Sequence, residues 1–313
     1  MRNHLDLSGG ECLQTDIYLI FNAKISTQDL DATFGFFLEG GNYFIGNHRR
    51  LCKFNRKTQL MTIGIINTTG SYQVTFSPTD NQVSEIEKWL IAERQKTGDG
   101  FYCNWNIIKS SFDNGELATI SLNSKAIGFA TWRLTTDKTA RIEIAEVKPT
   151  HRKKGIGKIL MTQLLNFLTD KGVCVVDLQC SPDTSEPVWK RLGFVEFPDP
   201  PENYNFNSGD NKKLYKILTE HLKTSSVQRS DETIELWNNE PYTTNDKTTP
   251  TYLWNVEFID ETRKLSQPII HPAHYEWRLL WRVNGNTIKD DKIKRFKPEI
   301  DFGTFIIIDE LTV

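Results

Sequence analysis

The most informative part of the chain is VKPTHRKKGIGK, residues 147–158, which lies between an expected strand and an expected helix. Gly155 and Gly157 let the backbone turn tightly and expose its N–H groups. Together with a helix N-terminus, which carries roughly half a positive charge, such groups form a cradle for an anion. Arg152 and three lysines add positive charge nearby. The loop is therefore expected to bind a pyrophosphate.

Two other glycine-rich phosphate motifs do not fit this stretch. The GxGxxG motif needs a glycine where the chain has Leu160, and the Walker A pattern is not matched either. Taken alone, the two glycines allow two interpretations: an anion-binding turn, or the start of a helix beside solvated lysines. The surrounding residues decide between them.

The pattern Val-x-Pro-x-x-Arg-x-x-Gly-Ile-Gly, placed on a strand, a loop and a helix, resembles the GNAT superfamily of N-acetyltransferases. A second block, WKRLGF at residues 189–194, is similar to the family's aromatic-x-x-x-Gly-Phe element. The expected order of elements over residues 71–218 also agrees: one strand, two helices, three strands, a helix, a strand, a helix and two strands. The resemblance implies an α/β fold with a mixed central sheet, and it covers about half of the chain.

The resemblance also implies a co-substrate and a set of site residues. Acetyl-CoA, or a close acyl-CoA relative, would bind with its pantetheine arm along residues 145–147 and its pyrophosphate on the backbone of residues 152–157. Glu143 matches an acidic position that often serves as general base, and Glu146 is its rival, because a bulge in the strand would change which of them faces the cleft. The implied catalytic residues are Glu143 and Glu146. The implied cofactor-binding residues are Ala145, Glu146, Val147, Arg152, Lys153, Lys154, Gly155, Ile156, Gly157 and Lys158.

The sequence departs from the family at the position of the usual general acid. The aromatic residue of the Gly-Phe element is commonly tyrosine, but here it is Trp189, whose indole N–H is not a usable acid. The asparagine often found at the start of that helix corresponds to Pro182. Protonation of the departing thiolate is left open between Cys180, Ser181, water and no residue at all. Acyl-CoA binding is expected to survive these changes.

Composition excludes several classes of protein. Lys and Arg number 38 against 40 Asp and Glu, so no global field would attract nucleic acid or an anionic membrane. The five cysteines are scattered without a CxxC pair, which favours reduced thiols and a cytoplasmic location. No segment approaches the roughly 20 apolar residues of a membrane span, and the first residues lack the apolar run of a secretory signal. His271 and His274 have no accompanying cluster, so no metal is expected.

The chain is expected to have three parts: a β-rich N-terminal extension at residues 1–70, the GNAT domain at 71–218, and a linker with a β-rich C-terminal module at 219–313. An apolar run at 16–21 is typical of a strand, and the first helix is expected to begin near Ser84. Residues 223–250 are polar and resemble a linker. Strands are expected at 252–259, 275–283 and 304–308, and four tryptophans in this part favour a core or a docking face.

The functional hypothesis is an N-acetyltransferase that moves an acetyl group from acetyl-CoA to a primary amine by direct attack. Two alternatives are a catalytically weak acyl-CoA sensor and an interaction protein that uses its C-terminal module. The acceptor stays open among small amines, antibiotics, peptide N-termini, lysine side chains and aminoacyl-tRNA. Neither a membrane nor free nucleic acid is an expected partner, and the oligomeric state is open.

Overall fold

The structure is a computed structural model. It describes residues 37–39, 42–45, 48–55, 60–67, 70–198, 212–245, 248–297 and 300–312, with side chains from residue 72 onward. The expected strand at 16–21 lies outside these residues. In the described part of the chain, no helix is both long and apolar enough to cross a membrane.

The chain divides into two compact units, residues 1–71 and residues 72–313. The described part of the first unit contains four strands, and each pairs antiparallel with the next. These strands are β1 (Phe37–Glu39), β2 (Asn42–Ile45), β3 (His48–Asn55) and β4 (Leu60–Asn67).

The GNAT-like part of the second unit is built on a sheet with the order β5-β6-β7-β8-β9-β11-β10. Among the described pairings of this sheet, β8 and β9 run parallel and the others antiparallel. β6 and β7 form a hairpin, and Asn123 and Ser124 of its turn both have positive φ. The strands are β5 (Gly70–Thr75), β6 (Leu117–Leu122), β7 (Lys125–Thr136), β8 (Thr139–Val147), β9 (Val175–Gln179), β10 (Val195–Glu196) and β11 (Lys213–Ile217). The mixed central sheet expected from the sequence is therefore confirmed.

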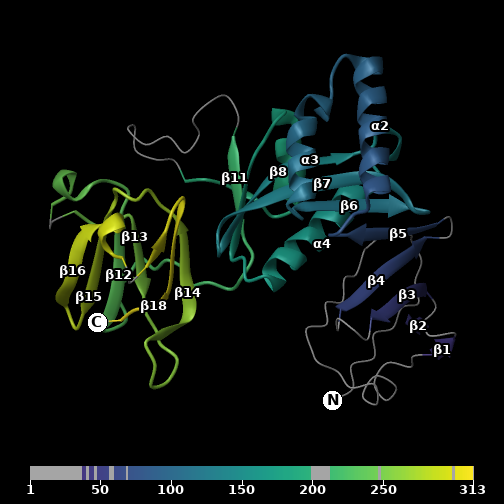
Figure 1. Cartoon of the computed structure of the whole chain (residues 1–313). Helices are drawn as coiled ribbons and strands as arrows, with labels where there is room; N and C mark the ends of the chain where they lie inside the picture. The colour runs from purple at the N-terminus through teal and green to yellow at the C-terminus, as the bar shows by residue number, and fades with distance from the viewer. Residues whose placement is uncertain are drawn as a thin grey trace, which may run out of the picture. The chain divides into compact units, whose positions relative to one another are not determined.

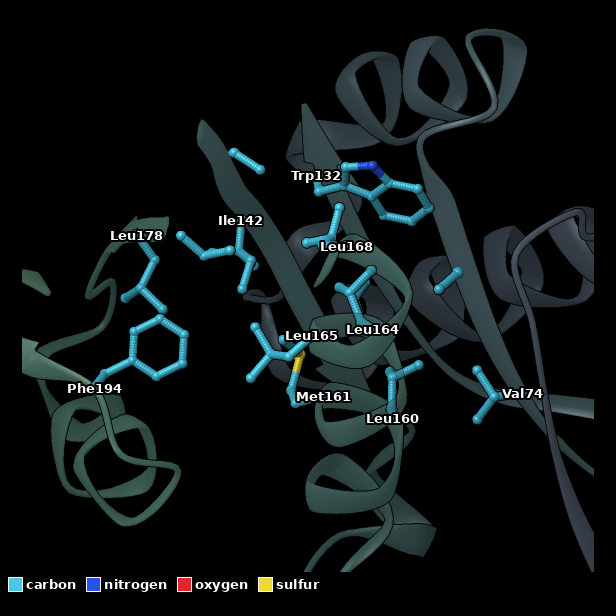
Figure 2. Packing of buried hydrophobic residues seen from close by; sticks show 14 of the residues in the cluster. Val74, Trp132, Ile142, Leu160, Met161, Leu164, Leu165, Leu168, Leu178 and Phe194 are labelled. Carbon is cyan, nitrogen blue, oxygen red and sulfur yellow. The ribbon is translucent and has the colours of Figure 1, made fainter. Parts of the chain in front are cut away.

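Helices cover both faces of this sheet (Figure 1). One face packs against α2 (Asp80–Thr97) and α3 (Trp105–Asp113), joined by the short η1 (Phe101–Asn104). The other face packs against α4 (Ile156–Asp170). Figure 2 shows Leu164 and Leu168 of α4 close to Trp132 of β7. The three remaining helical segments before β10 are η2 (Pro149–His151), η3 (Asp183–Ser185) and α5 (Glu186–Arg191).

The first helix begins earlier than the sequence pattern predicts. Thr79 is the N-cap of α2, and its hydroxyl accepts from the Gln82 N–H at 3.3 Å, while the Gln82 side chain accepts from the Thr79 N–H at 2.9 Å. This reciprocal pair is a capping box that uses glutamine instead of glutamate. The expected start at Ser84 is therefore wrong, because Ser84 lies inside the helix.

Residues after β11 form a module of two sheets. One sheet has the order β13-β12-β15-β16, and the other β14-β18-β17. Their facing sides share one apolar cluster that includes the buried Trp254, Trp277 and Trp281 (Figure 1). The strands are β12 (Glu232–Trp237), β13 (Tyr252–Asn255), β14 (Lys264–Pro272), β15 (Arg278–Val283), β16 (Asn286–Lys292), β17 (Asp301–Phe302) and β18 (Phe305–Glu310). The module also contains η4 (Pro241–Thr243) and η5 (Ile293–Arg295).

Strand β12 corrects the expected linker at residues 223–250. All six of its residues are buried, although Glu232, Thr233 and Glu235 make the strand look polar. The Glu232 carboxylate accepts from Arg263 at 2.6 Å and from the Trp281 indole at 2.8 Å, and Glu235 pairs with Arg282 at 2.9 Å. Charged side chains can be buried in a sheet when they are paired in this way. The polar sequence of β12 therefore does not indicate a linker.

The module packs against the central sheet through a second apolar cluster. Ile270 of β14 and Phe305 and Ile307 of β18 contact Val175 of β9 and Phe197. The Phe305 ring lies 5.5 Å from the Phe197 ring and 5.6 Å from the Tyr215 ring, centroid to centroid. At the edge of this contact, Lys138 pairs with Asp301 and Asp309 at 2.8 and 2.9 Å. The β14-β18 sheet is therefore apolar on both faces.

We predict that Phe305→Ala lowers the free energy of unfolding of the whole chain by about 3 kcal/mol, because it removes a buried ring from the contact between module and domain. Urea denaturation followed by tryptophan fluorescence measures this. Ile288→Ala is the matched control, because Ile288 lies in the same module but is 42% exposed. Equal stabilities for Phe305→Ala and the control would contradict the packing.

Candidate functional site

A bulge in β8 determines which of its side chains face which helices. Thr131 of β7 pairs with Ile144 and Trp132 pairs with Ile142, so Glu143 is an extra residue in the ladder. Before the bulge, Ile142 belongs to the core on the α4 face, and after it, Ile144 belongs to the core on the α2 face. One inserted residue thus reverses the alternation of side chains along the strand.

The same strand separates from its parallel neighbour. The β8–β9 pairing runs from Thr139 with Val175 to Ile142 with Leu178, and β9 ends at Gln179. Residues 143–147 of β8 therefore continue beyond their β9 partner. Glu143 as a whole is exposed while its side chain is only 26% exposed, so part of the accessible surface there is backbone.

The pairing with β7 shows which backbone groups face this opening. The Lys148 N–H donates to the Ile127 carbonyl at 2.8 Å, and hydrogen-bonded and non-hydrogen-bonded pairs alternate along an antiparallel ladder. The N–H and C=O of Ala145 and Val147 therefore point away from β7, whereas those of Glu146 point toward it. Of the three residues whose backbone is expected to bind the pantetheine arm, Ala145 and Val147 direct these groups toward the opening, and Glu146 directs them toward β7.

The glycine loop leads directly into α4. Gly155 is the N-cap of the helix with φ of 76°, and no side chain caps the helix there. A Cβ on Gly155 would meet no atom within 4 Å, so glycine is favoured there by the backbone conformation and not by crowding. The helix therefore begins at a glycine without a side-chain cap, an arrangement in which first-turn N–H groups can bind an anion.

The cations of the loop differ in their surroundings. Lys153 and Lys154 are exposed, and Lys154 donates to the Thr150 carbonyl at 3.1 Å. Partial burial lowers the pKa of His151, and the positive charges of Lys154 and Lys148 lower it further. The loop is thus electropositive on its exposed side. Arg152, in contrast, is engaged with carboxylates.

Glu146 accepts two hydrogen bonds near the opening. Its Oε1 lies 2.7 Å from the Val147 N–H nitrogen and 3.2 Å from Arg152 Nε. Burial raises the pKa of the Glu146 carboxyl above its ordinary value, and the bonds from Arg152 and Val147 offset this only in part. A buried carboxyl with a raised pKa is suited to proton transfer near neutral pH.

Glu143 is placed differently. Its Oε1 pairs with Arg133 Nε at 2.5 Å, and Arg141 beside it forms a two-pronged pair with Asp177 at 2.7 and 2.8 Å. These charges lie on the face of the sheet that α2 and α3 cover elsewhere. Glu143 and Glu146 are therefore both near the opening, one in an ion pair on the open sheet and the other buried beside the glycine loop.

The apolar residues of the second sequence block pack against the core: Phe194 is fully buried, and Trp189 and Leu192 are partly buried beside it. The Trp189 ring meets the Phe194 ring edge to face at 5.4 Å, next to the α4 side of the sheet. Cys180 is fully buried, and burial raises the pKa of its thiol, so it is a weak proton donor.

The sequence-based analysis missed Glu93, whose Oε1 lies 2.7 Å from Arg152 NH2. Glu93 belongs to α2 and stands 59 residues before Arg152. No spacing or motif in the sequence connects the two, because the contact depends on how α2 crosses the sheet. Arg133, the partner of Glu143, was missed for the same reason.

A strand that leaves its parallel neighbour beside a helix N-terminus without a side-chain cap offers backbone hydrogen-bonding groups and an anion site to one extended ligand. Residues 78–194 match the family model described as Acetyltransferase (GNAT) family. The central part of the chain is thus a GNAT domain, and acyl transfer is the general chemistry of this family.

Individual relatives resemble parts of the chain. An uncharacterized N-acetyltransferase, ycf52, from Pyropia yezoensis is 34% identical over 79 residues, which cover 25% of this chain and 44% of that protein. The chain therefore spans less than half the length of this relative. Among solved structures, Ard1 from Thermoplasma volcanium is similar at 20% identity, with 49% of this chain and 100% of that chain covered and a TM-score of 0.37. The PaiA N-acetyltransferase from Thermoplasma acidophilum, solved with coenzyme A, is 17% identical over 47% of this chain and 99% of its own, with a TM-score of 0.36.

We predict that Glu93→Gln lowers the pKa of Glu146. The negative charge of Glu93 is one of the causes that raise this pKa, and its removal also leaves Arg152 to Glu146 alone. A carboxyl carbon NMR titration measures the change. Glu87→Gln, which neutralises another carboxylate on α2, is expected to leave the pKa unchanged; an unchanged or higher value in Glu93→Gln would contradict the coupling.

Proposed function

We propose that this chain transfers an acetyl group from acetyl-CoA to the primary amine of an acceptor by direct attack. The observation that carries this proposal is the opening where β8 leaves β9, which lies next to the uncapped N-terminus of α4. The outward N–H and C=O of Ala145 and the C=O of Val147 would bind the pantetheine arm, whereas the Val147 N–H already donates to Glu146. The N–H groups of residues 152–157, with Lys153, Lys154 and Lys158 nearby, would bind the pyrophosphate.

The two carboxylates are proposed to act on protons. An amine is mostly protonated at neutral pH, so a base is needed to free its lone pair. Glu143 is the proposed base, through an ordered water, because its side chain lies on the open part of the sheet beside the opening. Glu146 is the alternative base, and its raised pKa supports that role.

The acceptor is proposed to approach on the face of the sheet that carries Glu143. Arg133, Arg141 and Asp177 form a row across three neighbouring strands of this face, and Tyr215 continues the row on β11. Tyr215 also contacts Phe305 of the C-terminal module. The module thus borders the proposed approach path, which supports a role in acceptor selection.

A second candidate is a catalytically weak protein that binds acyl-CoA as a sensor. One observation favours it: the Glu143 carboxylate is already held by Arg133. The two candidates share the cofactor site and differ in the chemistry that follows. Release of CoA from acetyl-CoA only in the presence of an amine supports the transferase.

For the cofactor, we predict that CoA raises the melting temperature of the protein and that Gly155→Asp abolishes this increase. The substitution places a negative charge and a strained backbone where the pyrophosphate is proposed to bind. Thermal shift against CoA concentration measures it. Gly285→Asp is the matched control, because Gly285 has φ of 74° and open space around it but lies in the C-terminal module. An undiminished shift in Gly155→Asp would overturn the cofactor site.

For the chemistry, we predict that Glu143→Gln keeps CoA affinity and lowers the transfer rate by about 10²–10⁴-fold. The loss is expected to be largest near neutral pH and to shrink as pH rises, because the free amine is then already abundant. Steady-state rates over a pH series with a panel of amines measure it. Trp189→Phe, which removes a packing residue, is expected to cost much less. Should Glu143→Gln equal the wild type while Glu146→Gln is slow, the base is Glu146.

A further inference from the structure

Arg152 occupies the position in the glycine loop from which a cation could reach a pyrophosphate, yet its side chain turns elsewhere. Its Nε donates to the Val147 carbonyl at 2.9 Å and to Glu146 Oε1 at 3.2 Å. Its NH2 lies 2.7 Å from Glu93 Oε1 and 3.1 Å from Glu146 Oε1. The guanidinium therefore joins α2, the end of β8 and the glycine loop.

The two carboxylates that hold Arg152 are more buried than the arginine itself. The side chains of Glu93 and Glu146 are 10% and 14% exposed, against 44% for Arg152. The second oxygen of Glu93 is buried without a hydrogen-bond partner among the described residues, and the carboxylate packs beside Gly100. Within the described part of the chain, the Glu93 carboxylate is thus committed to Arg152.

Charge argues against a phosphate role for this arginine. One guanidinium faces two carboxyl groups, so the group of three has no net positive charge to attract a pyrophosphate, and it is negative when both carboxyls are ionised. Lys153 and Lys154 are exposed, and the described structure gives neither of them an ion pair. Arg152 instead contacts the carbonyl of Val147, one of the two residues whose backbone groups face the opening.

We propose that Glu93 is a positioning residue for the strand that binds the pantetheine arm, an inference that rests on the proposed acyl-CoA function. Glu93 and Glu146 hold Arg152 against Val147 and so keep residues 145–147 in line at the opening. Arg152 thus supports binding of the pantetheine half of the cofactor, which carries no phosphate. Lys153 and Lys154 neutralise the charge of the phosphates. The carbonyl of Val147 retains a second lone pair for the pantetheine amide.

Comparison of CoA with pantetheine, which carries no phosphate, tests this assignment in the full-length chain. Affinities are measured by calorimetry for CoA and by NMR titration for pantetheine. Glu93→Gln and Arg152→Lys are each expected to weaken both ligands by the same factor, about tenfold, the usual scale for the loss of a hydrogen bond to a charged group. Lys153→Ala is the matched control and is expected to weaken CoA alone.

Arg152→Lys separates position from charge. Lysine keeps the positive charge but lacks the planar fork that reaches Val147, Glu146 and Glu93 together. If Arg152 binds phosphate, Arg152→Lys would keep most CoA affinity and leave pantetheine unaffected, which would overturn the proposal. A Glu93→Gln variant with unchanged affinity for both ligands would overturn it as well.

Salt dependence and circular dichroism serve as two further controls. The salt dependence of CoA binding is expected to be unchanged in Arg152→Lys and weaker in Lys153→Ala, because only the latter removes a cation from the phosphate site. If Glu93→Gln fails to fold, as judged by circular dichroism, Arg152→Lys alone decides. A wild-type protein that binds neither ligand would instead refute the proposed function.

Discussion

The extra residue at Glu143 is the constraint on which the site depends. β8 must pair with β7 along its whole length and with β9 along only part of it, and the bulge lets one strand do both. It also reverses the side-chain alternation, so that Ile142 faces α4 while Ile144 faces α2. Without the extra residue, Ala145 and Val147 would change faces, and the backbone groups at the opening would change with them.

Most of the central fold follows from local sequence patterns. The apolar face of α4, the hairpin turn at Asn123-Ser124 and the continuous apolar run of β9 all have local causes, and all three are present. The start of α2 was misplaced because Gln82 replaced the expected glutamate in the capping box. β12 was missed because Glu232 and Glu235 are neutralised by arginines from other strands, which a local pattern does not reveal.

The candidate site also combines features that the local sequence determines with features that depend on contacts between distant segments. The glycine loop and its basic residues are contiguous in sequence, so their conformation at Gly155 could be predicted. The direction of each β8 backbone group could not, because it depends on the position of a bulge that only the pairing with β7 defines. The contacts of Glu93 and Arg133 come from strand and helix crossings, and neither residue has a motif that marks it.

Because the β14-β18 sheet is apolar on both faces, the order in which strands are synthesised matters. Ile269 and Ile306 face the module's own core, while Ile270 and Ile307 cover β9 and β11. The ribosome delivers β9 and β11 first, and roughly 90 residues must follow before β18 is complete. At synthesis rates of about 5–20 residues per second, the nascent domain shows an uncovered apolar face for roughly 5 to 20 seconds. Apolar surface exposed for this time during synthesis is prone to aggregation.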